Sequence, residues 1–349
     1  MDLDLALTWF AVAVLAWVLF FVLEGFDFGV GYLGPLLGRT DAERSAAVRT
    51  VGPVWDGNEV WLVAAIGVTF AAFPDWYAAL LSGTYLPMVA ALLLLAVRGV
   101  AIEFRGKHDD RGWRARCDAF LGVSSLLLAA LWGAVVGALV TGLAMDAGGE
   151  VRASGLLGGL GRSVEPLLTP GAGVGAVAGV LLATLQGATF LSLRTTGALR
   201  VRARRVAVPA AAAGAFAALL TVVLAPSTPA AVAGALLTAA AVAAAARREA
   251  LAFATSSLAV VAAVVGALTA HFPVLLPTTL AGGADVTLRG AAASDGALEL
   301  ISVVGVVVLP GVVAYQLWSY WVFRRRVGGE RETPRPAGAQ RRQGVRLGR

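Results

Sequence analysis

Cysteine, histidine and buried methionine are all scarce in this chain of 349 residues. A single cysteine, Cys117, excludes an internal disulfide and a metal cluster held by cysteines. The two histidines, His108 and His271, lie outside the long apolar runs, and Met88 is the one methionine well inside such a run. Because haem held within a helical bundle needs His, Met or Cys as axial ligands, the residues predict no redox centre on this chain.

Charge is also scarce, and most other chemical motifs are missing. Charged residues make up 14% of the chain and hydrophobic residues 58%, which excludes an ordinary soluble domain and predicts an integral membrane protein. There is no helical E-x-x-H di-iron motif, phosphate-binding glycine loop or nucleophile elbow. The first apolar run continues into Glu24 without an Ala-x-Ala cleavage site, so we expect a retained helix and not a signal peptide.

Apolar runs of about one membrane thickness recur along the chain. The expected fold is an all-α integral membrane protein with two four-helix bundles and one peripheral helix. We expect nine transmembrane helices, at 5–23, 53–73, 77–97, 119–143, 171–193, 206–225, 230–246, 251–270 and 298–323. The sixth and seventh runs are rich in alanine and are separated by a short Pro-Ser-Thr-Pro turn, so their fusion would reduce the count to eight.

The distribution of lysine and arginine predicts the orientation. Of the 28 basic residues, 25 lie in alternate loops and in the C-terminal tail, whereas the other loops contain only Arg152, Arg162 and Arg289. By the positive-inside rule the N-terminus is outside, the C-terminus is cytoplasmic and the number of helices is odd. Topology therefore explains the excess of arginine, and we expect no nucleic-acid partner.

These patterns divide the chain into six predicted segments. The ranges are 1–144 for a first four-helix bundle with a polar cluster, 145–170 for an outer loop, 171–270 for a second, Ala-rich bundle, 271–297 for another outer loop, 298–323 for the ninth helix and 324–349 for a basic tail. The tail has few apolar residues to bury, so we expect it to be disordered, with its first arginines near anionic lipid headgroups.

The second apolar run opens with polar side chains among tryptophans. Asp56 and Glu59 are three residues apart and share one face of the predicted helix. Trp55 and Asn58 form a second pair with the same spacing, and Trp61 follows Asn58 by one turn. An acid in the first turn can simply cap the helix at the water boundary. Glu59 lies deeper, where a lone charge costs about 2 kcal/mol or more, so it predicts a functional site.

The predicted orientation brings charges from three successive helices to one depth, in the cytoplasmic third of the membrane. The five groups are Glu24, Asp27, Asp56, Glu59 and Arg98, with Glu103 just beyond them. One reading is a structural cluster in which Arg98 neutralises an acid and ties the helices together. The other is a protonatable relay, because four acids exceed one arginine and the excess requires water, protons or a partner surface.

Several ordered stretches resemble subunit II of the cytochrome bd quinol oxidase family. They lie at 24–31, 38–44, 52–62, 70–77, 104–107 and 111–114, and the likeness resumes at 253–258, 271–278 and 318–323. The Trp-Asp-Gly-Asn motif at 55–58 is the most specific of them. The resemblance thins between about residues 145 and 250.

The resemblance implies an accessory subunit of an oxidase that passes electrons from membrane quinol to oxygen in the bacterial cytoplasmic membrane. It implies a larger subunit I that carries two b-type haems and a haem d, and it allows a small accessory subunit as a further partner. Membrane lipid surrounds the complex. No cofactor is expected to be ligated by the present chain, which would stabilise subunit I and line access routes for protons and oxygen.

The resemblance also ranks the candidate residues. Asp56 would belong to a cytoplasmic proton route, and Trp61, with Trp55, to the oxygen path or to packing towards the haem. Some members of the family carry Gln at the position of Glu59 and Asp at that of Glu24, so the family ranks Asp56 first. The predicted proton route and polar cluster comprise Asp56, Asp27, Glu59, Glu24, Asn58, Arg98 and Glu103.

Two other functions stay open. A secondary transporter could use buried acids to couple ion movement to its substrate, but it would require broken helices near the midplane in two repeats. A purely structural scaffold subunit would use the acids only to pair with its partner.

Overall fold

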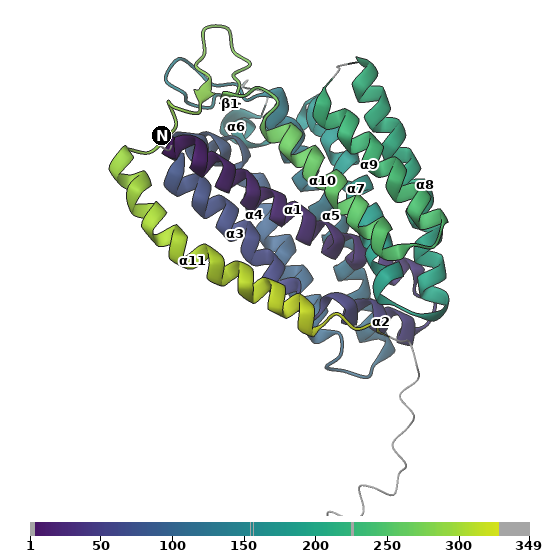
Figure 1. Cartoon of the computed structure of the whole chain (residues 1–349). Coiled ribbons are helices and arrows are strands. Elements are labelled where there is room, and N and C mark those ends of the chain that lie inside the picture. The colour runs from purple at the N-terminus through teal and green to yellow at the C-terminus, as the bar shows by residue number, and fades with distance from the viewer. Residues whose placement is uncertain (1–3, 154, 156, 225–226, 328–349) are drawn as a thin grey trace, which may run out of the picture.

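The computed structural model describes residues 4–153, 155, 157–224 and 227–327, and all but one small hairpin of its regular structure is helical (Figure 1). Most of the predicted basic tail, from residue 328 onwards, lies outside the described residues. The long helices are α1 (Leu5–Leu37), α3 (Trp55–Ala72), α4 (Pro74–Phe104), α5 (Arg111–Thr141), α7 (Pro170–Arg194), α8 (Gly197–Leu224), α9 (Thr228–Ala245), α10 (Glu249–Leu268) and α11 (Asp295–Val322).

Eight of the described helices are long and apolar enough to cross a membrane, so the chain is a multi-pass membrane protein. The helix outside this group is α3, whose 18 residues span about 27 Å but include Asp56, Asn58 and Glu59 in the first two turns. These polar side chains lower its hydropathy. The predicted total of nine spans therefore stays a prediction.

Several helices are longer than the apolar runs predict. The apolar run 5–23 predicts a helix that ends before Glu24. The observed helix α1 has 33 residues in all and ends at Leu37. The physical reason is that Glu24 and Asp27 are fully buried and face an arginine within the protein, so their charge does not end the helix at a water boundary.

Short elements close both ends of the bundle. At one end, which we call the α2 end, α2 (Asp41–Val51) forms in a segment expected to be a loop. Thr40 starts it with a capping box, because its hydroxyl accepts from the backbone of Glu43 while the Glu43 carboxylate accepts from the backbone of Thr40.

At the other end, which we call the hairpin end, antiparallel strands pair beside a group of very short helices. These elements are β1 (Val274–Leu276), β2 (Val286–Thr287), η1 (Gly158–Leu160), α6 (Gly161–Val164) and η2 (Glu165–Leu168). They lie in the two segments that the sequence assigns to outer loops.

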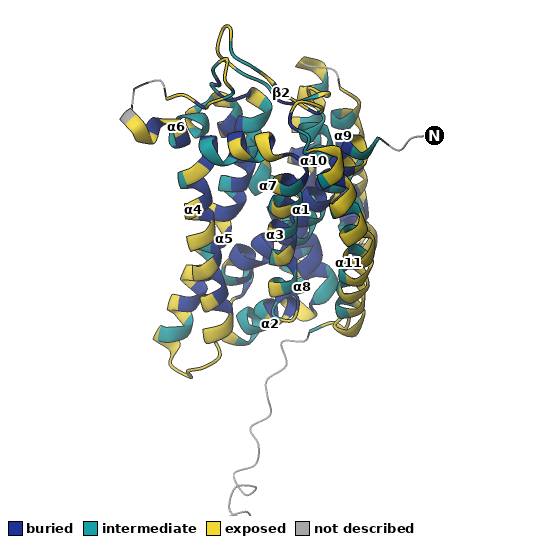
Figure 2. Cartoon of the chain, turned by 90° about the vertical axis from the view of Figure 1, so that its left-hand side faces the viewer, coloured by how far each residue is buried: buried dark blue, intermediate teal, exposed yellow. Residues whose placement is uncertain are grey.

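Helix α1 occupies the middle of the molecule and packs against α3, α5, α7 and α10 (Figure 1). Its close approach to α7 depends on Gly29, where a Cβ atom would overlap the carbonyl oxygen of Ala183. The rings of Phe26 and Phe190 stack across the same crossing at 4.2 Å. By contrast, α11 lies along the outside of the bundle beside α3 and α1 and is mostly exposed (Figure 2).

Candidate functional site

Arg98 is the centre of a buried charged cluster near the α2 end. It lies in the last turns of α4 with no exposed side-chain surface. Its guanidinium nitrogens are 3.5 Å from a carboxylate oxygen of Glu24, 3.5 Å from one of Asp27 and 3.1 Å from one of Glu59. The Phe28 ring covers the guanidinium at 5.2 Å. Arg98 therefore joins α1, α3 and α4, and we refer to Arg98, Glu24, Asp27 and Glu59 as the Arg98 cluster.

The Arg98 cluster contains more acids than bases. One guanidinium faces three carboxyl groups, so full ionisation would leave two uncompensated negative charges at a buried site. Among the described residues, both carboxyl oxygens of Glu24, Oδ1 of Asp27, and Nε and Nη2 of Arg98 have no hydrogen-bond partner. Buried polar atoms are normally paired, so this cluster has unused capacity to bind protons or water.

Asn58 connects the cluster to α11. Its side-chain amide donates to Asp27 Oδ2 at 2.7 Å, and its carbonyl oxygen accepts from Gln316 Nε2 at 3.0 Å and from the Tyr320 hydroxyl at 2.7 Å. Sequence reasoning missed Gln316 and Tyr320. The available signal was Gln316, the one amide side chain in the run 298–323, one turn before Tyr320.

Glu59 is the member of the cluster that reaches the surface, since 24% of its side chain is exposed whereas Glu24 and Asp27 are fully buried. Asp56 lies exposed in the first turn of α3, and Glu103 is exposed near the end of α4. Within the described part of the chain neither side chain makes a hydrogen bond or an ion pair. The structure thus brings Glu24, Asp27 and Glu59 to Arg98 but does not bring Asp56 or Glu103 there.

The two candidate tryptophans have different surroundings. Trp61 is buried in the hydrophobic core, and its indole Nε1 has no hydrogen-bond partner among the described residues. Trp55 is half-buried and lies over Gly99 of α4, where a Cβ atom would come within 3.0 Å of the indole. Both residues therefore pack against neighbouring helices of this chain.

A second charged network holds the α2 end together. Arg105, just after α4, donates to both carboxylate oxygens of Asp118 on α5, to Ser45 Oγ and to Asp41 Oδ1 on α2. Arg114 of α5 donates to the other oxygen of Asp41 at 2.6 Å. Burial alone would raise the pKa of Asp41, but the hydrogen bonds and charges of the two arginines leave that pKa below its ordinary value.

The described residues do not fit a haem. His108 is exposed and packs edge-on to Trp113, while His271 is exposed at the hairpin end and its Nε2 lies 2.9 Å from the carbonyl oxygen of Val140. Cys117 and Met88 lie on different helices. No group of three His, Cys, Asp or Glu side chains suited to a metal ion occurs among the residues that the structure describes.

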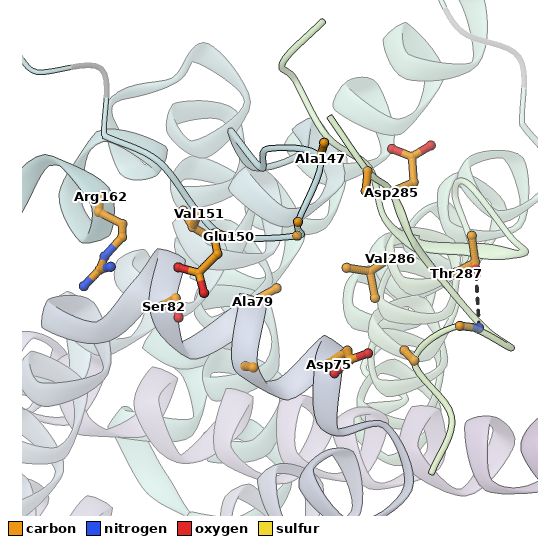
Figure 3. Close-up of a pocket in the computed structure, with 16 residues that line it drawn as sticks. Asp75, Ala79, Ser82, Ala147, Glu150, Val151, Arg162, Asp285, Val286 and Thr287 are labelled. Carbon is orange, nitrogen blue, oxygen red and sulfur yellow. Dashed lines mark hydrogen bonds between the residues drawn. The ribbon is translucent and has the colours of Figure 1, made fainter. Parts of the chain in front are cut away.

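A cavity of about 400 Å³ lies at the hairpin end of the bundle (Figure 3). It adjoins the first turns of α4, whereas Arg98 lies near the other end of that helix. It is lined by the start of α4 and by the two loop segments. Its charged lining consists of Asp75, Glu150, Asp285 and Arg162. The three acids are exposed, so their charges are solvated and need no ligand.

Comparison with known proteins relates the chain to respiratory oxidases. A family model described as "Cytochrome bd terminal oxidase subunit II" matches residues 5–323. The chain is 36% identical to "Cytochrome bd ubiquinol oxidase subunit 2" of Bacillus subtilis (strain 168), over 91% of this chain and 96% of the relative. It is 31% identical to "Cytochrome bd-I ubiquinol oxidase subunit 2" of Escherichia coli (strain K12), over 92% and 94%.

A solved structure agrees at the level of the fold. It is titled "The structure of bd oxidase from Geobacillus thermodenitrificans", and the match has a TM-score of 0.61 at 18% identity over 92% of this chain and 99% of that chain. The match of the family model over nearly all of the described residues, together with two relatives above 30% identity, establishes the relationship. The chain therefore belongs to the family of subunit II of cytochrome bd terminal oxidases.

Proposed function

We propose that the chain is the accessory subunit II of a bd-type quinol oxidase and that its Arg98 cluster carries protons from the cytoplasm towards oxygen chemistry in subunit I. The observation that supports this proposal is the three carboxyl groups around one buried guanidinium. The names of the relatives, subunits 2 of ubiquinol oxidases, support the rest. The haems, two b-type and one d-type, belong to subunit I, and the complex lies in the bacterial cytoplasmic membrane.

Charge balance explains why the cluster would bind protons. An uncompensated charge buried in the membrane costs several kcal/mol, so a cluster with two excess carboxylates is more stable when it binds protons. Glu59 ion-pairs with Arg98 and is partly exposed, so it is suited to exchange protons with water. Glu24 is fully buried and its oxygens have no hydrogen-bond partner among the described residues, so it is suited to hold a proton.

Asp56 has a different place in the proposal. It begins a stripe of exposed residues on α3 that continues through Val60, Val63 and Phe70, at helical spacing. An exposed stripe of this kind would face lipid or a partner subunit. We assign it to subunit I, where Asp56 would take protons across the interface and Trp61, one turn deeper on α3, would lie near the oxygen path.

The orientation follows from the same proposal. The α2 end, with its arginines, faces the cytoplasm, and the hairpin end faces outside. Helix α3 is then the ninth span, because Arg98 and subunit I cover its polar first turns. Oxygen reduction then takes protons from inside while quinol releases protons outside, so a membrane potential arises without a pump.

Carboxyl-to-amide substitutions in the purified complex test the proton route. Asp27→Asn and Asp56→Asn should each slow oxygen reduction by at least about tenfold with haem content unchanged, because proton delivery to a reacting centre commonly contributes more than that. Glu299→Gln is the matched control, because Glu299 is an exposed carboxyl near the start of α11. This variant should have normal turnover. Near-normal turnover of Asp56→Asn in an intact complex would remove Asp56 from the route.

The ion pairs that join Arg98 of α4 to α1 and α3 also favour a second function, that of a scaffold. In that case Asp27→Asn would lower haem content and activity in the same proportion. The turnover per haem therefore separates the two functions: it falls if Asp27 is part of the proton route and stays constant if the cluster is only a scaffold.

A further inference from the structure

Helix α11 is attached to the bundle at a few polar points. All of α11 is described, and Leu298 is its one buried residue. Near the hairpin end the Trp9 indole donates to Ser302 Oγ at 2.9 Å. At the opposite end, Arg194 of α7 donates to the carbonyl oxygen of Phe323, the residue that follows α11. Between these points Gln316 and Tyr320 bind Asn58. Ile301 and Val312 of α11 also pack against the core, but both are only partly buried. The polar contacts therefore contribute to the position of this helix.

The hydrogen bonds from α11 fix the orientation of Asn58. Its carbonyl oxygen receives two donors, and its amide N–H points at Asp27 Oδ2. If the amide were reversed, its carbonyl oxygen would lie 2.7 Å from a carboxylate oxygen, which is repulsive. Asn58 is fully buried, so no water competes at its surface. The two α11 side chains therefore present a donor to Asp27.

A donor at this position favours the ionised form of Asp27. Hydrogen bonds to the carbonyl oxygen of an amide polarise its N–H groups and strengthen them as donors. The charged and titratable groups that face Asp27 are Glu24 on its own helix, Glu59 from α3, Arg98 from α4 and Tyr320 from α11. From α7, Arg194 acts on Tyr320 electrostatically. Of these, Tyr320 alone reaches Asp27 through Asn58.

We propose that Gln316 and Tyr320 are positioning residues for the proton route, which hold Asn58 so that Asp27 releases its proton readily. This inference depends on the proposed function, since it assigns α11 a part in that route. The Tyr320 ring also packs edge-on to Phe26, the neighbour of Asp27, at 6.4 Å, so the hydroxyl is held in place by the ring as well as by its hydrogen bond.

Two substitutions that remove only the donors test the inference in the complete oxidase complex. Tyr320→Phe and Gln316→Met should each move the midpoint of the pH profile of oxygen reduction to higher pH by about 0.2–0.5 unit, because each removes one hydrogen bond that polarises Asn58 and leaves the Asn58–Asp27 hydrogen bond itself in place. The double variant should move it further. Tyr315→Phe on the same helix is the matched control and should show no shift, because the Tyr315 side chain is exposed and its hydroxyl makes no hydrogen bond within the described residues.

Infrared difference spectroscopy gives a readout that does not depend on turnover. A protonated-carboxyl band that disappears in Asp27→Asn identifies Asp27, and its titration in Tyr320→Phe should move with the activity midpoint. If both single variants lower only the thermal stability and leave the midpoint of the pH profile unchanged, the inference is overturned. Helix α11 would then have a structural role alone. If Tyr320→Phe fails to assemble, the same two measurements on Gln316→Met decide.

The outcomes also separate this inference from the function on which it depends. Slow turnover in Asp27→Asn, combined with an unshifted midpoint in both α11 variants, contradicts the positioning role alone. Normal turnover in Asp27→Asn contradicts the proton route itself, and the positioning role with it.

Discussion

The Arg98 guanidinium has more acidic neighbours than it can neutralise, and this is the central observation at the scale of single residues. Breaking a buried ion pair by removal of one partner is costly, because the remaining charge stays buried without compensation. Here the removal of the cation would leave three carboxyl groups from two helices facing one another. The cluster should therefore tolerate loss of an acid far better than loss of Arg98.

Arg98→Met should destabilise the complex by about 3–5 kcal/mol, the usual cost of leaving a buried charge unpaired. Adding Glu24→Gln to Arg98→Met should restore part of that loss, since it removes one of the facing acids. Thermal unfolding and yield of the purified complex measure both effects. A double variant no more stable than Arg98→Met would contradict the charge balance described for this cluster.

The sequence predicted which acids share the depth of Arg98, because antiparallel helices bring the end of one beside the start of the next. It could not predict the rotation of α3. Asp56 and Glu59 are three residues apart, which places them about 60° apart around the helix, and this angle is enough for Glu59 to reach Arg98 while Asp56 stays exposed. Asn58 was predicted in the cluster, but its partners on α11 are 258 and 262 residues away.

At the scale of helices, the ends were harder to predict than the spans. The apolar runs predict where the helices lie. They stop at charged residues, but inside the bundle such residues are paired with side chains of other helices, so the helices continue past them. Arg105 shows the same effect, since it follows α4 directly and is still buried by Asp118 and Asp41. The helix α2 had a readable signal in its Thr40–Glu43 capping box.

The α2 end should lose stability in acid. A carboxyl whose pKa is lowered on folding stabilises the protein above its unfolded pKa, and that contribution disappears as the pH falls through the folded pKa. For Asp41 the ordinary value is 3.8 and the folded value is lower, so the loss falls below about pH 4. The midpoint of thermal unfolding, measured from pH 6 to pH 3, should therefore fall more steeply in the wild type than in Asp41→Asn.

An equal pH dependence in the two proteins would show that Asp41 contributes no linked stability. Glu150→Gln is a suitable control for this comparison, because Glu150 is an exposed carboxyl at the hairpin end, far from the α2 network. It should have the wild-type pH dependence.

At the scale of the whole molecule, composition alone predicted a membrane protein, and the ordered motifs predicted its family. The packing of the second half was harder to predict. Helices α8, α9 and α10 consist largely of alanine, valine and leucine, and these side chains do not indicate which helices pack against one another. The division into two four-helix bundles and the orientation in the membrane stay predictions. An asymmetry is clear, however: the charges buried around Arg98 all come from the first half of the chain.

The haem absorption of the complex should come from subunit I and not from this chain. Purified in mild detergent on its own, the subunit should be colourless, because its histidines, Cys117 and Met88 do not converge on a haem. Co-purified with subunit I it should show haem absorption. The visible spectrum of the two preparations checks this, and a haem spectrum from the isolated subunit would contradict the assignment of all haems to subunit I.

The position of Arg98 on α4 has a consequence for biogenesis. Ribosomes deliver α1 and α3 to the insertion machinery before α4, so Glu24, Asp27 and Glu59 enter the lipid phase ahead of Arg98, the cation that all three contact. Until α4 arrives, the nascent chain must keep these acids protonated or remain beside the insertion channel. Arrival of Arg98 then completes the first stable intermediate, and chains truncated before α4 should be cleared by quality-control proteases.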